Sequence, residues 1–409
     1  MHPLRLSLFA LLLLAVFGLS QGANAEKEPL WNYTTGDDVS LVAISADGEY
    51  IVASSDDRNV SLFRKESSIP LWNYSFGGQI YSVTISADGE YIVVGVSDER
   101  IYIFNKDSST PLWIHNNERI AYSVAISANG EYAVAGTMHG DVFLFHKDSS
   151  SPLWSYKTGG DVHSVDISTD GEYIVAGSHD HKVYFFSKDN STPLWSHTTH
   201  DVVYSVAISA DGEYIAAGSD DNHLYLFNKD SSTPLRSYTE DTCQGGCDVR
   251  HLAISADGEY IVTASWARIY LFNKDSEEPL WYSNCPPAFG CDVRSVDISA
   301  DGKYIVAGST SKKIYLFSKD SSTPLWNYTA GYDVMAVSIS ADGKYIAAGS
   351  DDNNIYLFDN NVSQKSSDDN NGENGNDGGN SGGGNGGSST EEAVCQHGDS
   401  KLADDGFNQ

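Results

Sequence analysis

The chain has 409 residues, of which 56 are acidic and 25 are basic, so its formal net charge is −31. A surface this negative repels phosphate backbones and anionic lipids, which excludes nucleic-acid binding and polybasic membrane binding as default functions. Hydrophobic residues make up 40% of the chain, enough for a substantial core, and the 5 cysteines are too few for a small fold held together by disulfides.

Residues 1–25 have the pattern of a secretory signal peptide. Arg5 supplies positive charge, residues 6–19 form an apolar run, and Ala-Asn-Ala at residues 23–25 offers a cleavage site before Glu26. The alternative is a membrane anchor, but the run is only about 14 residues long, and crossing the hydrocarbon core takes roughly 20. We therefore expect a secreted or cell-surface protein with no transmembrane segment after cleavage.

The middle of the chain is one unit repeated eight times. One string, Ile-Ser-Ala-Asp-Gly-Glu/Lys-Tyr, alternates with a second string, Pro-Leu-Trp, in which Arg236 replaces Trp once. The spacing is 41 residues, except where two insertions lengthen the link between the strings from 15 residues to 20 and 19. The first string starts at Ile44, Ile85, Ile126, Ile167, Ile208, Ile254, Ile298 and Ile339, and the second at Pro29, Pro70, Pro111, Pro152, Pro193, Pro234, Pro279 and Pro324.

Each unit predicts four short strands. In the last copy, Asp342-Gly343 is a strong hairpin signal because Gly tolerates positive φ, and no part of residues 29–358 has the 3.6-residue period of a helix. The fold class is therefore expected to be all-β. The strands of the last copy are predicted at residues 325–328, 333–339, 345–348 and 355–358.

Four strands in about forty residues are typical of one propeller blade. The first outer strand, residues 30–33, has no three strands before it, and the last strand, residues 355–358, has no outer strand after it. The first strand is therefore expected to complete the last blade, which closes the ring and covers an open edge. The prediction for residues 26–360 is an eight-bladed β-propeller closed by its N-terminal strand.

The units resemble the WD40 repeat. Val-x-Ser-Val-Ala-Ile-Ser-Ala-Asp-Gly looks like the first strand and turn of that family, and Gly-Ser-Asp-Asp at residues 218–221 and 349–352 looks like its Gly-Ser-x-Asp loop. Tyr-Leu-Phe at residues 225–227 stands where the family has Trp-Asp. The usual Gly-His before the first strand is missing, so we expect the family's structural tetrad to be incomplete.

Tryptophan lies instead on the outer strand of seven units. Eight blades with an outer-strand Trp are also similar to quinoprotein-like propellers, in which such residues lock adjacent blades. The resemblance covers roughly 330 of the 409 residues. It implies a fold but little about function, because propellers host many activities. The tryptophans are Trp31, Trp72, Trp113, Trp154, Trp195, Trp281 and Trp326.

The C-terminal part has no propeller pattern. Residues 361–394 are acidic and rich in Gly, Asn and Ser, and we expect a disordered linker there. Residues 395–409 begin with Cys395 and form either a disordered tail or the start of a second small module. Sequons for N-glycosylation occur at Asn32, Asn59, Asn73, Asn190, Asn327 and Asn361.

Functional candidates come from comparing the repeats with one another. The residue four before the Ile of the first string varies most, and the WD40 resemblance puts it near one rim of the central channel, on the face with the loops between the third and fourth strands. Tyr, Arg, Met and Trp are common in binding hot spots, so we expect a recognition surface. The alternative is that these exposed positions vary by sequence drift without a function. The predicted rim residues are Tyr81, Tyr122, His139, His163, His179, Tyr204, Arg250, Trp266, Arg294 and Met335.

Histidines gather in the loops of the same face, at His139, His163, His179, His181, His200, His223 and His251. Imidazoles that converge on a channel can bind a transition metal. His179 and His181 are the only close pair, however, and no spacing typical of a metal site is present. We therefore expect solvated loop histidines and no metal site.

Four cysteines fall in the two insertions: Cys243 and Cys247, and Cys285 and Cys291. In a secreted chain each pair is expected to form a local disulfide; a crosslink between the two insertions or a zinc site of four thiolates are the alternatives. In each case the insertions stiffen the sector that contains Arg250 and Arg294, the best candidates for binding an acidic group.

Signatures of enzymes are missing: the sequence has no Gly-x-Ser-x-Gly elbow, no phosphate-binding Gly-rich loop and no His-Glu-x-x-His. The adjacent cysteines of quinoprotein dehydrogenases are also absent. We expect a monomeric, non-enzymatic module without a cofactor that binds a protein, peptide or glycan. The alternatives are a quinone- or metal-dependent redox enzyme and a structural component of the cell envelope.

Overall fold

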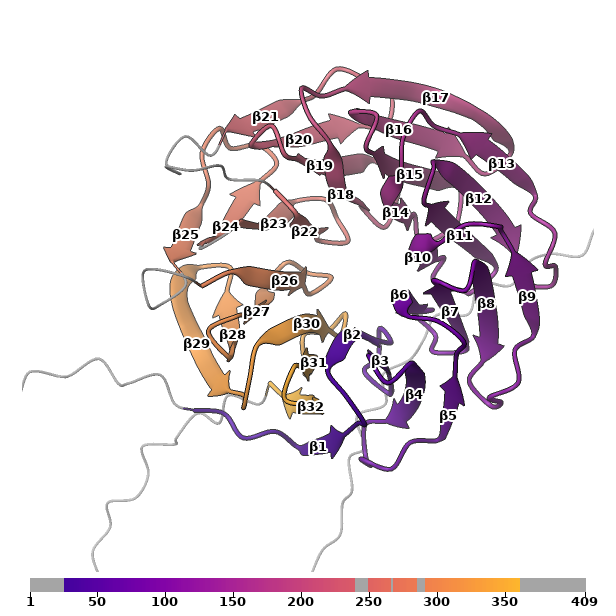
Figure 1. Ribbon diagram of the computed structural model, residues 1–409. Coiled ribbons are helices and arrows are strands. Elements are labelled where there is room, and N and C mark those ends of the chain that lie inside the picture. Colours follow the sequence, from indigo (N-terminus) through magenta and orange to yellow (C-terminus); the bar gives the residue numbers. More distant parts are fainter. Residues whose placement is uncertain (1–25, 240–248, 266–267, 285–290, 361–409) are drawn as a thin grey trace, which may run out of the picture. The chain divides into compact units, whose positions relative to one another are not determined.

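The protein is described by a computed structural model that covers residues 26–239, 249–265, 268–284 and 291–360. All regular structure in these residues is β: eight four-stranded antiparallel sheets stand as blades around a central axis (Figure 1). The prediction of an all-β, eight-bladed propeller is confirmed. The described ranges contain no helix long and apolar enough to cross a membrane.

Several predictions concern residues outside these ranges. The signal peptide (1–25), the linker (361–394) and the short tail (395–409) all lie there, as do Trp266, Cys243, Cys247 and Cys285. These stay predictions.

The strands repeat in the same order in every blade, from the axis outward. The innermost strands are β2 (Val39–Ile44), β6 (Ile80–Ile85), β10 (Ala121–Ile126), β14 (Val162–Ile167), β18 (Val203–Ile208), β22 (His251–Ile254), β26 (Val293–Ile298) and β30 (Val334–Ile339). The second strands are β3 (Tyr50–Ser55), β7 (Tyr91–Val96), β11 (Tyr132–Thr137), β15 (Tyr173–Ser178), β19 (Tyr214–Ser219), β23 (Tyr260–Ser265), β27 (Tyr304–Ser309) and β31 (Tyr345–Ser350).

The two outer positions complete each sheet. The third strands are β4 (Asn59–Arg64), β8 (Arg100–Asn105), β12 (Asp141–His146), β16 (Lys182–Ser187), β20 (His223–Asn228), β24 (Arg268–Asn273), β28 (Lys313–Ser318) and β32 (Asn354–Asp359). The outermost strands are β5 (Trp72–Ser75), β9 (Trp113–Asn116), β13 (Trp154–Lys157), β17 (Asn190–Thr198), β21 (Arg236–Thr239), β25 (Trp281–Asn284), β29 (Ser321–Thr329) and β1 (Trp31–Thr34). Blades are numbered 1 to 8 by their innermost strands, from β2 to β30.

The ring is closed by its first strand. β1 pairs with β32 in antiparallel register, with Trp31 opposite Leu357, and belongs to the sheet of blade 8 (Figure 1). The N–H of Leu30 donates to the carbonyl of Leu357 at 2.7 Å, and the N–H of Ala341 donates to that of Ala46 in blade 1 at 2.9 Å. The predicted closure is therefore confirmed, and β1 covers the outer edge of β32.

The turn between the first two strands of each blade needs glycine for two reasons. Gly212 has a φ of +73°, and a Cβ there would lie 2.6 Å from Cδ2 of Tyr173 in the preceding blade. Any larger residue would strain the turn and push the blades apart. The same contact joins Gly48 to Tyr345, Gly89 to Tyr50, Gly130 to Tyr91, Gly171 to Tyr132, Gly258 to Tyr214, Gly302 to Tyr260 and Gly343 to Tyr304.

Tryptophan locks neighbouring blades at the outer wall, as the quinoprotein-like resemblance implied. The indole N–H of Trp195 in blade 4 donates to the carbonyl of Lys229 in blade 5 at 2.7 Å. Blade 5 has Arg236 in place of Trp, and there Tyr238 takes over: its hydroxyl donates to the carbonyl of Ser276 in blade 6 at 2.9 Å. Equivalent indole bonds to backbone carbonyls come from Trp31, Trp72, Trp113, Trp154 and Trp281 to Lys65, Lys106, Lys147, Lys188 and Lys319. In blade 7, the indole N–H of Trp326 donates to the side-chain oxygen of Asn360 at 3.4 Å.

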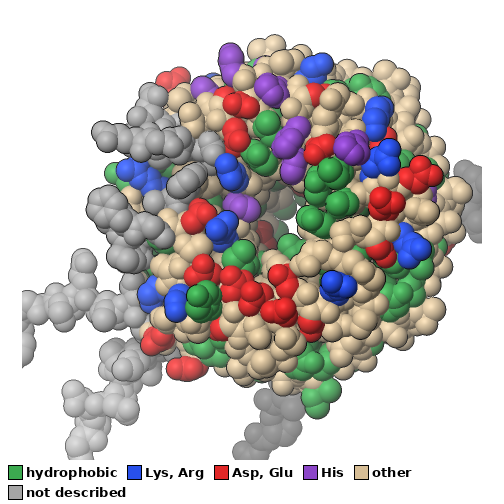
Figure 2. Space-filling model, in the orientation of Figure 1, with side chains coloured by type: hydrophobic (Ala, Val, Ile, Leu, Met, Phe, Trp, Pro, Cys, Tyr) green, Lys and Arg blue, Asp and Glu red, His purple; other side chains and the backbone are tan. Residues whose placement is uncertain are grey.

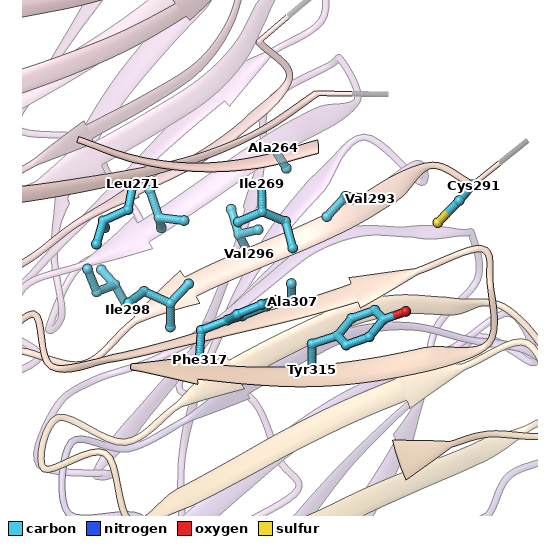
Figure 3. Packing of buried hydrophobic residues seen from close by; sticks show 12 residues of the cluster. Ala264, Ile269, Leu271, Cys291, Val293, Val296, Ile298, Ala307, Tyr315 and Phe317 are labelled. Atoms are coloured by element: carbon cyan, nitrogen blue, oxygen red, sulfur yellow. The ribbon is translucent and has the colours of Figure 1, made fainter. Parts of the chain in front are cut away.

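The core lies between blades rather than inside one sheet. Between blades 6 and 7, Ile269 and Leu271 of β24 pack with Val296 of β26 (Figure 3). Phe317 of β28 is 1% exposed and closes the same cluster. Each sheet thus buries both faces against its neighbours, which a lone blade cannot do.

The incomplete tetrad has a substitute. In blade 4 the hydroxyl of Tyr184 donates to Asp180 at 2.6 Å, and the N–H of Gly159 donates to the same carboxylate oxygen at 2.7 Å. A tyrosine hydroxyl and a backbone N–H thus hold the loop aspartate, while Phe stands at the position of the family's Trp. The same Tyr–Asp bond occurs in the pairs Tyr102–Asp98, Tyr225–Asp221 and Tyr356–Asp352.

Candidate binding surface at the mouth of the propeller

The variable residue of the innermost strand occupies a β-bulge. In blade 2, Ile80 pairs with Val96 and Ser82 with Gly95, so Tyr81 has no partner in the ladder. A bulge turns its side chain away from the regular packing, which frees this position from the constraints of the wall. The bulge residues are Ser40, Tyr81, Tyr122, His163, Tyr204, Arg294 and Met335. Arg250, the counterpart in blade 6, directly precedes β22.

Five of the predicted residues form a continuous chain of ring contacts across blades 2 to 5. The rings of Tyr81 and Tyr122 meet edge to face with centroids 5.4 Å apart, and Tyr122 stacks on His163 at 4.9 Å. His163 in turn lies 4.0 Å from His179 and 5.3 Å from Tyr204. We call Tyr81, Tyr122, His163, His179 and Tyr204 the aromatic arc.

The arginines extend this arc into blades 6 and 7. The guanidinium of Arg250 lies 5.2 Å from the ring centre of Tyr204. Each arginine also has an acidic neighbour: Arg250 Nε is 3.8 Å from Asp220, and Arg294 Nε is 3.4 Å from Asp292. A small pocket lies between the two arginines, with His251 and Asp292 in its lining. An incoming acidic group would compete with these aspartates for the arginines.

The described part of the mouth contains one compact His-His-Asp group. Asp161 precedes β14, His163 is the bulge residue of β14, and His179 follows β15. One potential ligand atom from each lies within 4.8 Å of the others. Burial lowers the pKa of His163 to about 4, helped by His179 and opposed by Asp161, so this imidazole is neutral at pH 7.

The opposite side of the mouth is acidic. Asp38, Asp56, Asp333 and Asp351 of blades 1 and 8 form what we call the acidic arc, and Figure 2 shows acidic side chains gathered beside the central hollow where β30 and β2 lie. Burial and the nearby carboxylates of the arc together raise the pKa of Asp351 to about 6, against the opposing effect of Arg294. The mouth is therefore polarised, with rings and arginines on one side and carboxylates on the other.

The structure brings together most, but not all, of the predicted rim residues. His139 is exposed with a φ of 71°, and its backbone N–H donates to Asp161 at 2.7 Å. Met335 is the bulge residue of blade 8, the blade that contributes Asp333 and Asp351 to the acidic arc. Cys291 is disulfide-bonded, but all other cysteines lie outside the described residues, so the predicted pairing is not decided.

Only two of the histidines in the sequence cluster meet in the described residues. His163 and His179 stack, whereas His200 is exposed and His223 stacks on Tyr225 of its own strand. Sequence reasoning missed Asp161, because an aspartate before the innermost strand is also present in other blades and looked like a feature of the repeat. It also missed the convergence of Asp38 and Asp333 on the acidic arc.

The comparisons with known proteins agree with this architecture. A family model described as "Outer membrane protein assembly factor BamB" matches residues 23–238, just over half of the chain. The WD domain, G-beta repeat model matches residues 233–273, 285–318 and 322–359. No curated protein matches the chain.

Solved structures with the same fold include Sqt1 from Chaetomium thermophilum. One structure shows it bound to the N-terminus of the ribosomal protein L10, with a TM-score of 0.70 and 15% sequence identity, covering 82% of this chain and 100% of that one. A second Sqt1 structure has the same TM-score and sequence identity. The match covers 82% of this chain and 99% of that one. At this identity the likeness concerns the fold alone. The chain belongs to the β-propeller family of the BamB-type model, and its last three repeats match the WD40 family.

Proposed function

We propose that the protein is a non-enzymatic binding module that holds a protein or peptide at the mouth of the propeller. The observation that carries this proposal is the aromatic arc, in which side chains on the bulges of successive innermost strands touch one another. Tyrosine offers a large contact area at a low cost in conformational entropy, and such residues dominate binding energy at interfaces.

The polarised mouth favours a peptide over a small molecule. An extended ligand across the mouth would place aromatic or acidic groups against Tyr204 and Arg250, and basic groups against the acidic arc around Asp351. Sqt1 provides a parallel, since that propeller was solved with the N-terminus of a ribosomal protein bound. The matched family model is also named for an assembly factor rather than for an enzyme.

Secretion is the second part of the proposal. It rests on the apolar run and the Ala-Asn-Ala site in residues 1–25, and it predicts a mature protein that starts at Glu26. N-terminal sequencing of the protein from its native source tests this part, and a start at Met1 contradicts it.

The binding proposal is tested by selecting from a displayed library of random peptides on the purified propeller. Two variants probe the mouth: Tyr122→Ser with Tyr204→Ser, and Arg250→Glu with Arg294→Glu. Serine is the bulge residue of blade 1, so the first variant introduces a side chain that the fold already accepts. We expect each variant to weaken the selected peptides at least tenfold.

The matched control is Lys303→Glu with Lys344→Glu. It makes the same charge change as the arginine variant, but at the turns on the other end of the strands, where six blades already have Glu. We expect it to bind the peptides like the unaltered protein. Equal binding by all variants, or no peptide selected at all, contradicts the proposal.

A further inference from the structure

The His-His-Asp group of blade 4 has the composition of a metal site. Its members come from three places that the fold brings together: the residue before β14 (Asp161), the bulge of β14 (His163) and the loop after β15 (His179). Neutral imidazole nitrogen and carboxylate oxygen are the donors that Zn²⁺ and related divalent ions prefer. No other group of three such side chains in the described residues has its donor atoms this close.

The two imidazoles are also unsatisfied. The Nε2 atoms of His163 and His179 are both buried from solvent and have no hydrogen-bond partner in the described part of the chain. Buried polar atoms are normally paired with a hydrogen-bond partner, so two unpaired atoms in one place indicate a missing ligand.

Two hydrogen bonds from backbone N–H groups hold Asp161 in place. Oδ1 of Asp161 accepts the backbone N–H of His139 at 2.7 Å, and the N–H of His179 donates to the backbone carbonyl of Asp161 at 2.8 Å. Hydrogen bonds of this kind orient metal ligands and raise their affinity. The loops after β11 and β15 therefore position Asp161 and His179 relative to each other.

We propose that Asp161, His163 and His179 bind one divalent transition-metal ion at the mouth of the propeller, with Zn²⁺ as the ion that fits the donors. Zn–N and Zn–O distances of about 2.0–2.2 Å place the donors of a tetrahedral ion roughly 3.4 Å apart. The three donor atoms, now within 4.8 Å, must close by up to about 1.4 Å, and this requires the stacked rings of His163 and His179 to rotate toward the ion.

Three protein ligands leave at least one coordination position open. The ion would therefore be able to accept a water molecule or a donor atom from outside the chain, beside the rings of Tyr122 and Tyr204. The high negative charge of the protein, −31, attracts cations to its surface and favours occupancy.

The test is calorimetric titration of the chelator-treated, full-length protein with Zn²⁺ at pH 7. We expect one saturable site per chain. The variants His163→Tyr and His179→Ser introduce residues found at the same positions in other blades, Tyr204 and Ser97, so both are expected to fold. Each should weaken binding at this site at least tenfold.

The control is His200→Ala, which removes a histidine of the same face whose side chain is 87% exposed. It should bind Zn²⁺ like the unaltered protein. Titration with Co²⁺ gives an independent readout, because ligation by the protein produces visible absorption bands that should disappear in both variants. Absence of a saturable site, or a site that persists in His163→Tyr and His179→Ser, overturns the proposal. Neither result depends on a peptide partner, so the binding proposal above is judged separately.

Discussion

The walls between the blades have nearly the same residues all round the ring, whereas the residues at the mouth of the propeller differ from blade to blade. At the walls, the same contact recurs around the ring: a turn glycine lies on a tyrosine, and an indole N–H reaches the next blade. At the mouth, the bulge residue is Ser, Tyr, His, Arg or Met according to the blade. The difference predicts that the walls bear the stability of the ring, whereas the bulge residues can change without disturbing it.

The largest effect is expected when the ring is opened. Deleting residues 26–36 removes β1, so β32 loses its outer strand partner and Trp31 no longer donates to Lys65 across the wall between blades 8 and 1. Because each blade depends on its neighbours, we expect a fall in Tm of more than 10 °C or loss of cooperative unfolding. Circular dichroism during heating measures this. An unchanged Tm would show that closure does not stabilise the ring.

A single wall glycine is expected to matter next. Gly212→Ala places a Cβ 2.6 Å from Tyr173 at a φ of +73°, so we expect a loss of about 2–4 kcal/mol in the free energy of unfolding. Gly77→Ala is the control, since the nearest atom to its Cβ is 3.9 Å away; it should change stability by less than about 0.5 kcal/mol. Urea unfolding measures the stability of both variants. Equal losses would contradict the idea that the contact between the turn glycine and the tyrosine supports the ring.

Two walls contain a partly buried carboxylate that makes stability depend on pH. Asp166 accepts the N–H of Ile208 in the next blade at 3.0 Å, and burial raises its pKa to about 6; Asp297 is the equivalent in blade 7. The folded state therefore holds more protons than the unfolded state between pH 4 and 6, so stability falls as the pH rises through this window.

Replacing these carboxylates should flatten that dependence. Asp166→Ala with Asp297→Ala introduces the residue found at Ala207, and we expect the fall in stability between pH 4 and 7 to shrink by on the order of 2 kcal/mol per carboxylate. Urea unfolding at several pH values measures it. The exposed Asp230→Ala serves as control, and an unaltered pH profile of the double variant would contradict the assignment.

A smaller effect is expected from removing the Tyr238 hydroxyl, which joins blade 5 to blade 6 where the Trp is missing. Tyr238→Phe removes a hydroxyl that donates to the carbonyls of Asn273 and Ser276 in the next blade, which should cost about 1 kcal/mol. Tyr282→Phe, whose side chain is 51% exposed, is the control. If both variants are equally stable to urea, Tyr238 does not replace the missing Trp.

The smallest effect is expected at the mouth. Tyr81→Ser replaces a bulge residue that is 41% exposed by the bulge residue of blade 1, so stability should change by less than about 0.5 kcal/mol. A loss as large as that of Gly212→Ala would mean that the mouth also supports the fold. Denaturant unfolding of the two variants side by side makes the comparison.

Much of the architecture could be predicted from local patterns. The Asp-Gly turn, the strand positions and the count of eight repeats are all properties of short segments, and the unpaired outer strand at residues 30–33 implied closure. The predicted rim positions were found in the same way, because repeats within one chain show which residue varies against a constant background. The replacement of Trp by Tyr238 was not predicted, since its partner lies 38 residues further along the chain.

The amino-acid sequence alone determined the repeat, the class of fold and the positions that vary, because each depends on the period of one short unit. Only the tertiary structure decided which of the variable side chains meet. Tyr122, His163 and Tyr204 are about 41 residues apart in the chain, yet their rings are in contact, because the ring places equivalent residues of successive blades side by side. The group of Asp161, His163 and His179 emerges for the same reason: strand pairing in β14 and β15 joins a loop, a bulge and a strand end that no spacing in the sequence connects.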